Sequence, residues 1–112
     1  MSVIETLNPL QIRNQLQLSQ EHMSRLLHVS NKTLWRWEKT ETSPKSKIIQ
    51  HLTKLKKIAE IAQKVYTPDG INAFLTTPME VFGGRTAYEL MSIGEYDQVI
   101  AALAADYEGL GY

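Results

Sequence analysis

The sequence predicts an all-α fold, and three observations support this prediction. Most segments open with a helix-capping residue, often followed by proline at the first helical position. Apolar residues then recur at the three- and four-residue spacing of one helix face. No stretch shows the sustained apolar–polar alternation that a half-buried strand requires. We therefore expect helices at 9–16, 20–27, 31–39, 44–66, 69–75, 78–81, 87–91 and 95–106.

Polar caps mark the helix starts in the first half of the chain. Asn8 stands before a proline, with a glutamine three residues after the cap. Ser19 and Ser30 stand before the next two helices, which are separated by a turn of three residues. Ser43 repeats the cap-then-proline pattern. The long helix that it opens would turn seven apolar residues inward: Ile48, Leu52, Leu55, Ile58, Ala59, Ala62 and Val65.

Turn residues divide the second half into shorter helices. Residues 67–70, TPDG, form a turn sequence, and residues 83–84, a glycine pair, break the chain again. Thr86 caps the next helix, and Glu89 stands at the position that completes a capping box. The last helix has a helical apolar period that predicts one inward face: Tyr96, Val99, Ile100, Leu103 and Tyr107.

The two halves of the chain carry opposite charge, although the net charge of the whole is zero. Residues 1–66 hold eleven Lys/Arg against five Asp/Glu, a balance of +6, and residues 67–112 hold Arg85 alone against seven acids, a balance of −6. Because the reversal coincides with the turn at 67–70, we expect two domains, 1–66 and 67–112. The basic half suits nucleic acid, and the acidic half suits a protein partner or simply solvent.

Composition excludes several classes of function. The absence of cysteine excludes disulfides and thiolate metal sites, and the three histidines stand on different elements, so we expect no metal site. No carboxylate pair, nucleophile–base set or phosphate-binding loop is present, so we expect neither an enzyme nor a cofactor. With no long apolar run and no signal-peptide pattern, we expect a cytoplasmic protein that does not bind membranes.

Residues 18–38, LSQEHMSRLLHVSNKTLWRWE, have the pattern of a helix-turn-helix. Ser24 is small where the two helices should cross. Leu34 and Trp37 are spaced to face the core. The opposite face offers Lys32 and Arg36, together with an asparagine, and these side chains can bond base edges in a major groove.

This stretch resembles the Xre family of helix-turn-helix proteins, and the match covers about residues 12–55. It is carried by Leu18-Ser19-Gln20, Val29-Ser30 and residues 33–38, TLWRWE. The resemblance implies a structural ion pair between Arg13 and Glu38, and it implies five residues at the DNA: Gln20, Asn31, Lys32, Thr33 and Arg36. In that interpretation Gln20 grips a phosphate, Asn31 pairs with adenine and Arg36 pairs with guanine. Trp35 is expected to shield the helix edge, stack on sugar or pack against the loop near Pro44.

The second half resembles the C-terminal toxin-binding domain of the Xre/MbcA/ParS antitoxins. The likeness is carried by residues 74–78, FLTTP, then 81–86, VFGGRT, then 89–91, ELM. Ala87 stands where that family usually has proline. The end of the chain, residues 107–112, keeps the family's aromatic–glycine character.

Together the two resemblances imply the antitoxin of a RES–Xre toxin–antitoxin pair. Such a protein would neutralise a RES-type, NAD-degrading toxin by direct binding, would bind its own operator DNA as a homodimer, and would do no chemistry. The alternative is a stand-alone Xre-type transcriptional regulator whose second half only dimerises.

The expected toxin-binding residues lie in the turn at residues 83–86, which we call the glycine turn, and at the end of the chain: Arg85, Tyr107, Gly109, Leu110 and Tyr112. Arg85 has two possible roles. It can anchor a toxin, or it can staple its own domain by bonding helix C-terminal carbonyls. We favour the staple for Arg85, and we expect the last helix and the tail to form the main toxin surface.

Overall fold

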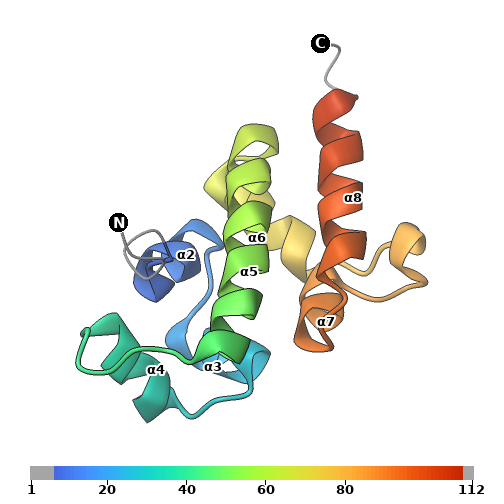
Figure 1. The fold of residues 1–112 in the computed structure, drawn as a ribbon. Helices are drawn as coiled ribbons and strands as arrows, with labels where there is room; N and C mark the ends of the chain where they lie inside the picture. Colours follow the sequence, from blue (N-terminus) through green and yellow to red (C-terminus); the bar gives the residue numbers. More distant parts are fainter. Residues whose placement is uncertain (1–6, 110–112) are drawn as a thin grey trace.

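The computed structural model describes residues 7–109, and within this range every regular element is helical, as the sequence predicts (Figure 1). Within the described residues, four helices lie in the basic half, and three helices with one 3-10 turn lie in the acidic half. The elements are α2 (Pro9–Gln15), α3 (Gln20–Leu27), α4 (Asn31–Glu38), α5 (Ser46–Val65), α6 (Pro68–Thr76), η1 (Glu80–Phe82), α7 (Ala87–Ser92) and α8 (Tyr96–Glu108).

The first three helices begin at the predicted caps. The side chain of Asn8 accepts a hydrogen bond from the backbone N–H of Gln11, and the side chains of Ser19 and Ser30 do the same for N–H groups three residues further on. Each bond satisfies a donor that the first helical turn leaves free. His28 ends α3 in the left-handed conformation, with φ of 58°, which turns the chain sharply toward α4.

Helix α5 begins later than predicted. We expected Ser43 to cap a helix starting at Pro44, but the cap position is Lys45, which makes no side-chain capping bond. The Pro44 residue is buried, and Lys45 keeps an extended backbone with ψ of 169°. The prediction was wrong because the proline packs into the protein before the helix starts.

The second half follows the predicted order with small shifts. Helix α6 begins at Pro68 instead of Asp69, because the Thr67 side chain caps it. The capping box that joins Thr86 and Glu89 at the start of α7 is confirmed in both directions. The glycine pair adopts positive φ, 68° at Gly83 and 86° at Gly84, a conformation that side chains disfavour.

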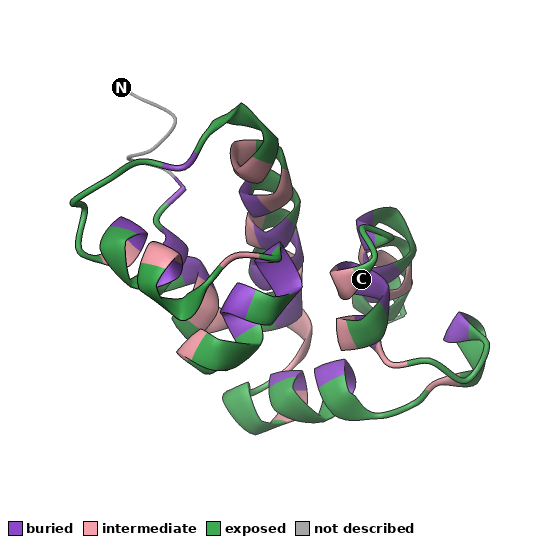
Figure 2. Ribbon diagram, turned by 90° about the horizontal axis from the view of Figure 1, so that it is seen from below, coloured by how far each residue is buried: buried purple, intermediate pink, exposed green. Residues whose placement is uncertain are grey.

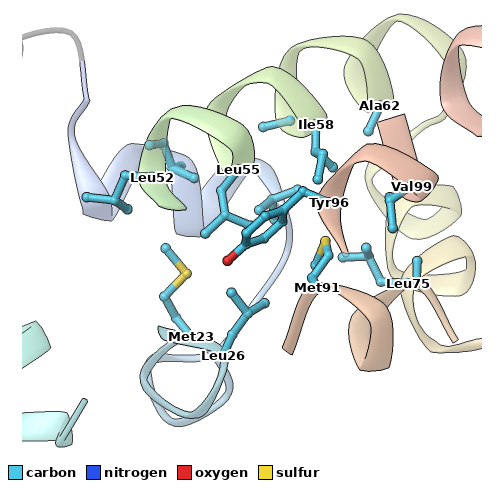
Figure 3. Packing of buried hydrophobic residues seen from close by; sticks show 14 of the residues in the cluster. Met23, Leu26, Leu52, Leu55, Ile58, Ala62, Leu75, Met91, Tyr96 and Val99 are labelled. Carbon is cyan, nitrogen blue, oxygen red and sulfur yellow. The ribbon is translucent and has the colours of Figure 1, made fainter. Parts of the chain in front are cut away.

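One apolar core runs through both halves. Helix α5 stands at the centre of Figure 1 and packs along α8, while α2, α3 and α4 gather on its other side. The buried cluster takes in residues from every helix, and the buried faces turn inward throughout (Figure 2). Figure 3 shows Leu55 and Ile58 of α5 meeting Tyr96 and Met91 from the second half. The division into two domains at residue 66 stays a prediction.

The end of α8 departs from the predicted apolar face. Tyr96, Val99 and Leu103 are buried as expected, but Tyr107 is 42% exposed. Its ring lies beside the end of α5, where the Nζ of Lys64 is 5.8 Å from the ring centroid. The Tyr107 ring therefore contacts the charged end of Lys64 and not an apolar side chain that would bury it.

Some of the opposite charges of the two halves pair with each other inside the molecule. Lys54 on α5 pairs with Asp97 on α8 at 2.8 Å, and this hydrogen bond and charge hold the pKa of the Asp97 carboxyl below its ordinary value. The hydroxyl of Tyr66 donates to Asp106 at 2.8 Å. One cation of α5, Lys54, therefore pairs with an acid of α8, whereas no cation of α4 forms an ion pair with α8 within residues 7–109.

Candidate functional site

Helix α4 presents the predicted division into an inner and an outer face. Leu34 is fully buried and Trp37 is 8% exposed, so both belong to the core. Asn31, Lys32 and Arg36 are exposed. No ion pair engages Lys32 or Arg36 within residues 7–109, so both cations are free to meet a ligand.

The predicted ion pair between α2 and α4 is confirmed. Arg13 Nε donates to Glu38 Oε2 at 2.7 Å, and Arg13 Nη2 donates to Glu38 Oε1 at 3.1 Å. A third bond joins Arg13 Nη1 to the Leu18 carbonyl at 3.3 Å. The Glu38 side chain is only 6% exposed and that of Arg13 is 17% exposed. This pair fixes the end of α4 against α2, with the planar fork that guanidinium and carboxylate favour.

Gln20 joins this network. Its Nε2 donates to Glu38 Oε1 at 3.1 Å, and the residue is half-buried. One N–H of this amide is therefore used within the protein, and its second N–H, its oxygen and the backbone N–H are left for a phosphate or base. Sequence reasoning placed Gln20 at the DNA but did not find its bond to Glu38.

Asn31 and Thr33 are also tied to the protein on one side. The hydroxyl oxygen of Ser24, which is 4% exposed, lies 2.6 Å from the side-chain amide of Asn31 and 2.8 Å from the Glu21 carbonyl, to which the hydroxyl can donate. Ser30 Oγ donates to Thr33 Oγ1 at 2.9 Å, and Thr33 is half-buried. The small residue that we expected at the helix crossing therefore also bonds a predicted DNA contact, a role that the spacing did not reveal.

Trp35 lies on the exposed side of α4. Its side chain is 42% exposed, and Lys39 Nζ lies 5.9 Å from the centroid of its ring. This contact places a cation and an aromatic face together beside Arg36. The cation suits a phosphate by its charge, and the ring can stack on a sugar or a base.

The glycine turn holds Arg85 outward. Its backbone is fixed, because the Met79 N–H donates to the Arg85 carbonyl at 3.1 Å and the Arg85 N–H donates to Phe82 at 3.3 Å. The side chain is exposed and makes no hydrogen bond or ion pair to any part of the chain that the structure describes. The staple that we favoured is therefore wrong, since the turn holds itself together by backbone bonds alone.

An apolar groove lies near this turn, and the sequence did not predict it. It has a volume of about 310 Å³ and lies between η1 and the outer face of α8, lined by Val81, Phe82, Gln98, Ala101, Ala102 and Ala105. Val81 is 67% exposed, which is unusual for a large aliphatic side chain. A run of alanines at positions 101, 102, 104 and 105 was the available signal, because it leaves one side of α8 without bulk.

Two of the other expected partner-binding residues, Tyr107 and Gly109, lie at the end of α8. Tyr107 and Gly109 are exposed. Leu110 and Tyr112 lie outside the described residues. The structure thus places Arg85 and Tyr107 at separate points of the second half.

The three histidines each contact the other half of the chain. The Tyr88 hydroxyl donates to the His22 carbonyl at 2.9 Å, His28 Nε2 lies 2.7 Å from the Ser92 carbonyl, and His51 Nδ1 lies 2.8 Å from the Tyr96 hydroxyl. Burial raises the pKa of Tyr96 to about 12. No group of metal-ligating side chains occurs within residues 7–109. In the same range no helix has the length and hydrophobicity to cross a membrane.

Comparison with known proteins gives one informative result. No protein-family model and no curated protein sequence matches the chain. Among solved structures, it matches a chain in the crystal structure of the M. tuberculosis MbcT–MbcA toxin–antitoxin complex. The two chains share a fold. The TM-score is 0.80 over 94% of this chain and 95% of the other, with 24% sequence identity. The predicted resemblance to an antitoxin is thus confirmed in the fold.

Proposed function

We propose that this chain is an antitoxin that binds a protein toxin through its second half and operator DNA through α4. The observation that carries the proposal is the fold shared with a chain of a toxin–antitoxin complex over nearly the whole length. The exposed cations of α4 and the outward Arg85 support it. The proposed partner is a RES-type, NAD-degrading toxin, blocked by occupancy and not by chemistry.

The proposed toxin surface combines Arg85, the groove beside Val81 and the end of α8. Arg85 offers an exposed guanidinium that has no hydrogen-bond or ion-pair partner among residues 7–109, which suits a carboxylate of the toxin. The groove offers room for an apolar side chain. Tyr107 adds an exposed aromatic ring, a residue type enriched in interfaces. Gly109, Leu110 and Tyr112 complete the proposed surface from the chain end.

The proposed DNA surface is the outer face of α4, with Lys32 and Arg36 as its charged groups and Asn31, Thr33 and Gln20 beside them. The helix α4 and the segment around η1 lie on opposite sides of the molecule (Figure 1). One chain therefore has room to hold DNA and toxin together. We also propose a homodimer, since paired readers bind two half-sites of one operator and would allow the pair to regulate its own transcription.

Co-expression with the product of the neighbouring gene tests the toxin part. We expect that protein to arrest growth and lower cellular NAD when alone, and this chain to restore both through a complex recovered by pull-down. Arg85→Ala and Tyr107→Ala should weaken the complex. Arg25→Ala is the matched control, because Arg25 is an exposed arginine paired with Glu21 in the other half. A harmless neighbour that forms no complex would favour the stand-alone regulator instead.

Binding to the promoter fragment tests the DNA part. Lys32→Ala and Arg36→Ala should weaken binding, and each lost phosphate contact should reduce the slope of log K against log salt by about 1. Lys56→Ala is the matched control, since Lys56 lies on α5 and faces Glu60. Equal losses in all three variants would show that only general charge matters, and the assignment of α4 would be wrong.

A further inference from the structure

Trp35 is the large aromatic side chain that α4 leaves outside the core. It is 42% exposed, whereas the other tryptophan of this helix, Trp37, is 8% exposed and belongs to the core. Trp35 lies four residues after Asn31 and three after Lys32, so these three exposed side chains share one side of α4. This is the side that we propose meets DNA, and the Trp35 ring would therefore lie against the duplex in the complex.

The contacts of Trp35 leave part of its ring free. Lys39 Nζ lies over the ring, 5.9 Å from its centroid, so a cation occupies one face. Among the residues that the structure describes, the side-chain hydrogen bonds of α4 run through Asn31, Thr33 and Glu38, and none uses the indole N–H. The other face of the ring and the N–H are therefore open to a ligand.

An indole offers a hydrogen-bond donor directly beside apolar carbon. In the major groove thymine presents the matching pair, the O4 acceptor next to the C5-methyl group. Guanine presents acceptors without a methyl group, and adenine and cytosine present an amino donor. Thymine is thus the base whose groove edge complements both parts of the Trp35 side chain.

The place of Trp35 in the helix favours a base over a sugar. A helix-turn-helix directs the N-terminal residues of its second helix at base edges. Long helical side chains lean toward the N-terminus of their own helix, so we expect the Trp35 ring to lie over the turn that begins at Asn31. The ammonium of Lys39, one turn further on, is the member of this pair that suits a phosphate.

We infer that Trp35 is a specificity-determining residue that selects thymine, with its ring against the C5-methyl group and its N–H donating to O4. The inference rests on the proposed DNA binding and names a base that the α4 surface reads. It adds an apolar contact to the polar ones proposed for Asn31 and Arg36.

Replacement of thymine by uracil in the promoter fragment provides the first test. Deoxyuridine keeps the O4 atom and the base pairing of thymidine but lacks the methyl group. Each thymine of the sequence that the full-length chain protects is replaced in turn, and affinities are compared at one fixed salt concentration. We expect about fourfold weaker binding when the thymine that Trp35 contacts is replaced, which is the effect of leaving one methyl group unburied.

Substitutions of Trp35 assign that effect to its side chain. In Trp35→Ala, and in Trp35→Gln as a second variant, the thymine and uracil duplexes should bind equally well at that position, while any methyl effect at other thymines stays. Trp35→Phe keeps an aromatic ring without the N–H, so it should keep a preference for thymine over uracil but bind the natural site more weakly. Ile93→Ala is the matched control, because Ile93 is an apolar residue that is 60% exposed in the other half. Its thymine-to-uracil ratio should equal that of the wild-type chain.

The outcomes separate this inference from the proposed function. Specific binding in which no thymine loses affinity on replacement by uracil overturns the inference with the wild-type chain alone. A uracil effect that persists at every thymine in a folded Trp35→Ala or Trp35→Gln protein also overturns it, because the ring would then touch only sugar or phosphate. Both results leave DNA binding standing, whereas failure of the chain to bind any duplex would overturn both proposals.

Discussion

Removal of the Glu38 carboxylate should be among the most destabilising polar substitutions in this chain. Glu38 is 6% exposed and accepts three hydrogen bonds, two from Arg13 and one from Gln20. In Glu38→Ala the Arg13 guanidinium keeps the Leu18 carbonyl as its one partner among residues 7–109. Breaking a buried pair by deleting one member costs about 3–5 kcal/mol. Arg13 is 17% exposed and regains some hydration, so we expect the lower end, about 3 kcal/mol.

Thermal and urea denaturation followed by circular dichroism measure this loss. For a chain of 112 residues, 3 kcal/mol corresponds to a fall in Tm of roughly 12 °C. Glu21→Ala is the control, because its pair with Arg25 is exposed and the loss should stay below about 0.5 kcal/mol. The double substitution Arg13→Met with Glu38→Leu should recover most of the stability, since no buried charge is left unpaired.

A Glu38→Ala protein that melts within about 2 °C of the wild-type chain would refute this reasoning, because that shift corresponds to less than 1 kcal/mol. Unchanged Tm in Arg13→Ala with weakened DNA binding would likewise assign Arg13 to the DNA and not to the fold.

Three further predictions concern the core, the glycine turn and alkaline pH. Leu103→Ala removes a fully buried side chain and should lower the free energy of unfolding by about 2–5 kcal/mol in urea titrations; a smaller loss would mean that the α5–α8 contact closes around the gap. Gly84→Ala should lower the free energy of unfolding by about 1–2 kcal/mol, because an added Cβ meets no atom within 4 Å and the cost arises from holding alanine at a φ of +86°. Gly84→Asn should cost less, because asparagine tolerates positive φ better, and equal losses in the two variants would contradict this backbone explanation. Burial, together with the hydrogen bond to Asp106, raises the pKa of Tyr66 from 10.0 to about 12, so the folded state holds this proton more tightly. The stability that this raised pKa contributes is complete below pH 10 and is lost as pH rises from about 10 to 12. The free energy of unfolding should therefore fall across that window, and Tyr66→Phe should make the fall smaller.

Local sequence signals predicted the elements of the fold well, because most helix starts depend on a few adjacent residues. Asn8, Ser19, Ser30 and Thr86 cap helices as expected, since a capping bond spans only three residues. Ser43 failed because burial of the adjacent proline, a tertiary effect, decided where the helix begins.

The exposure of the α4 side chains was predicted, but their bonding was not. The pattern of α4 indicated which side chains face outward, because helical periodicity settles that. The bonds from Ser24 to Asn31 and from Gln20 to Glu38 join different elements, and no spacing rule announces them. The expected staple of Arg85 failed for a related reason: the turn closes through backbone bonds, which residue types do not reveal.

The shared core has a consequence for genetics. Helix α5 buries Leu55, Ile58 and Ala62 in a cluster that includes residues of α7 and α8. A nonsense codon shortly after residue 66 would therefore leave a helix with an uncovered apolar face, and the truncated product would tend to aggregate or be degraded. Premature stops in the second half should behave as null alleles of the whole gene, so only missense alleles at exposed positions such as Arg36 and Arg85 can separate its two proposed activities.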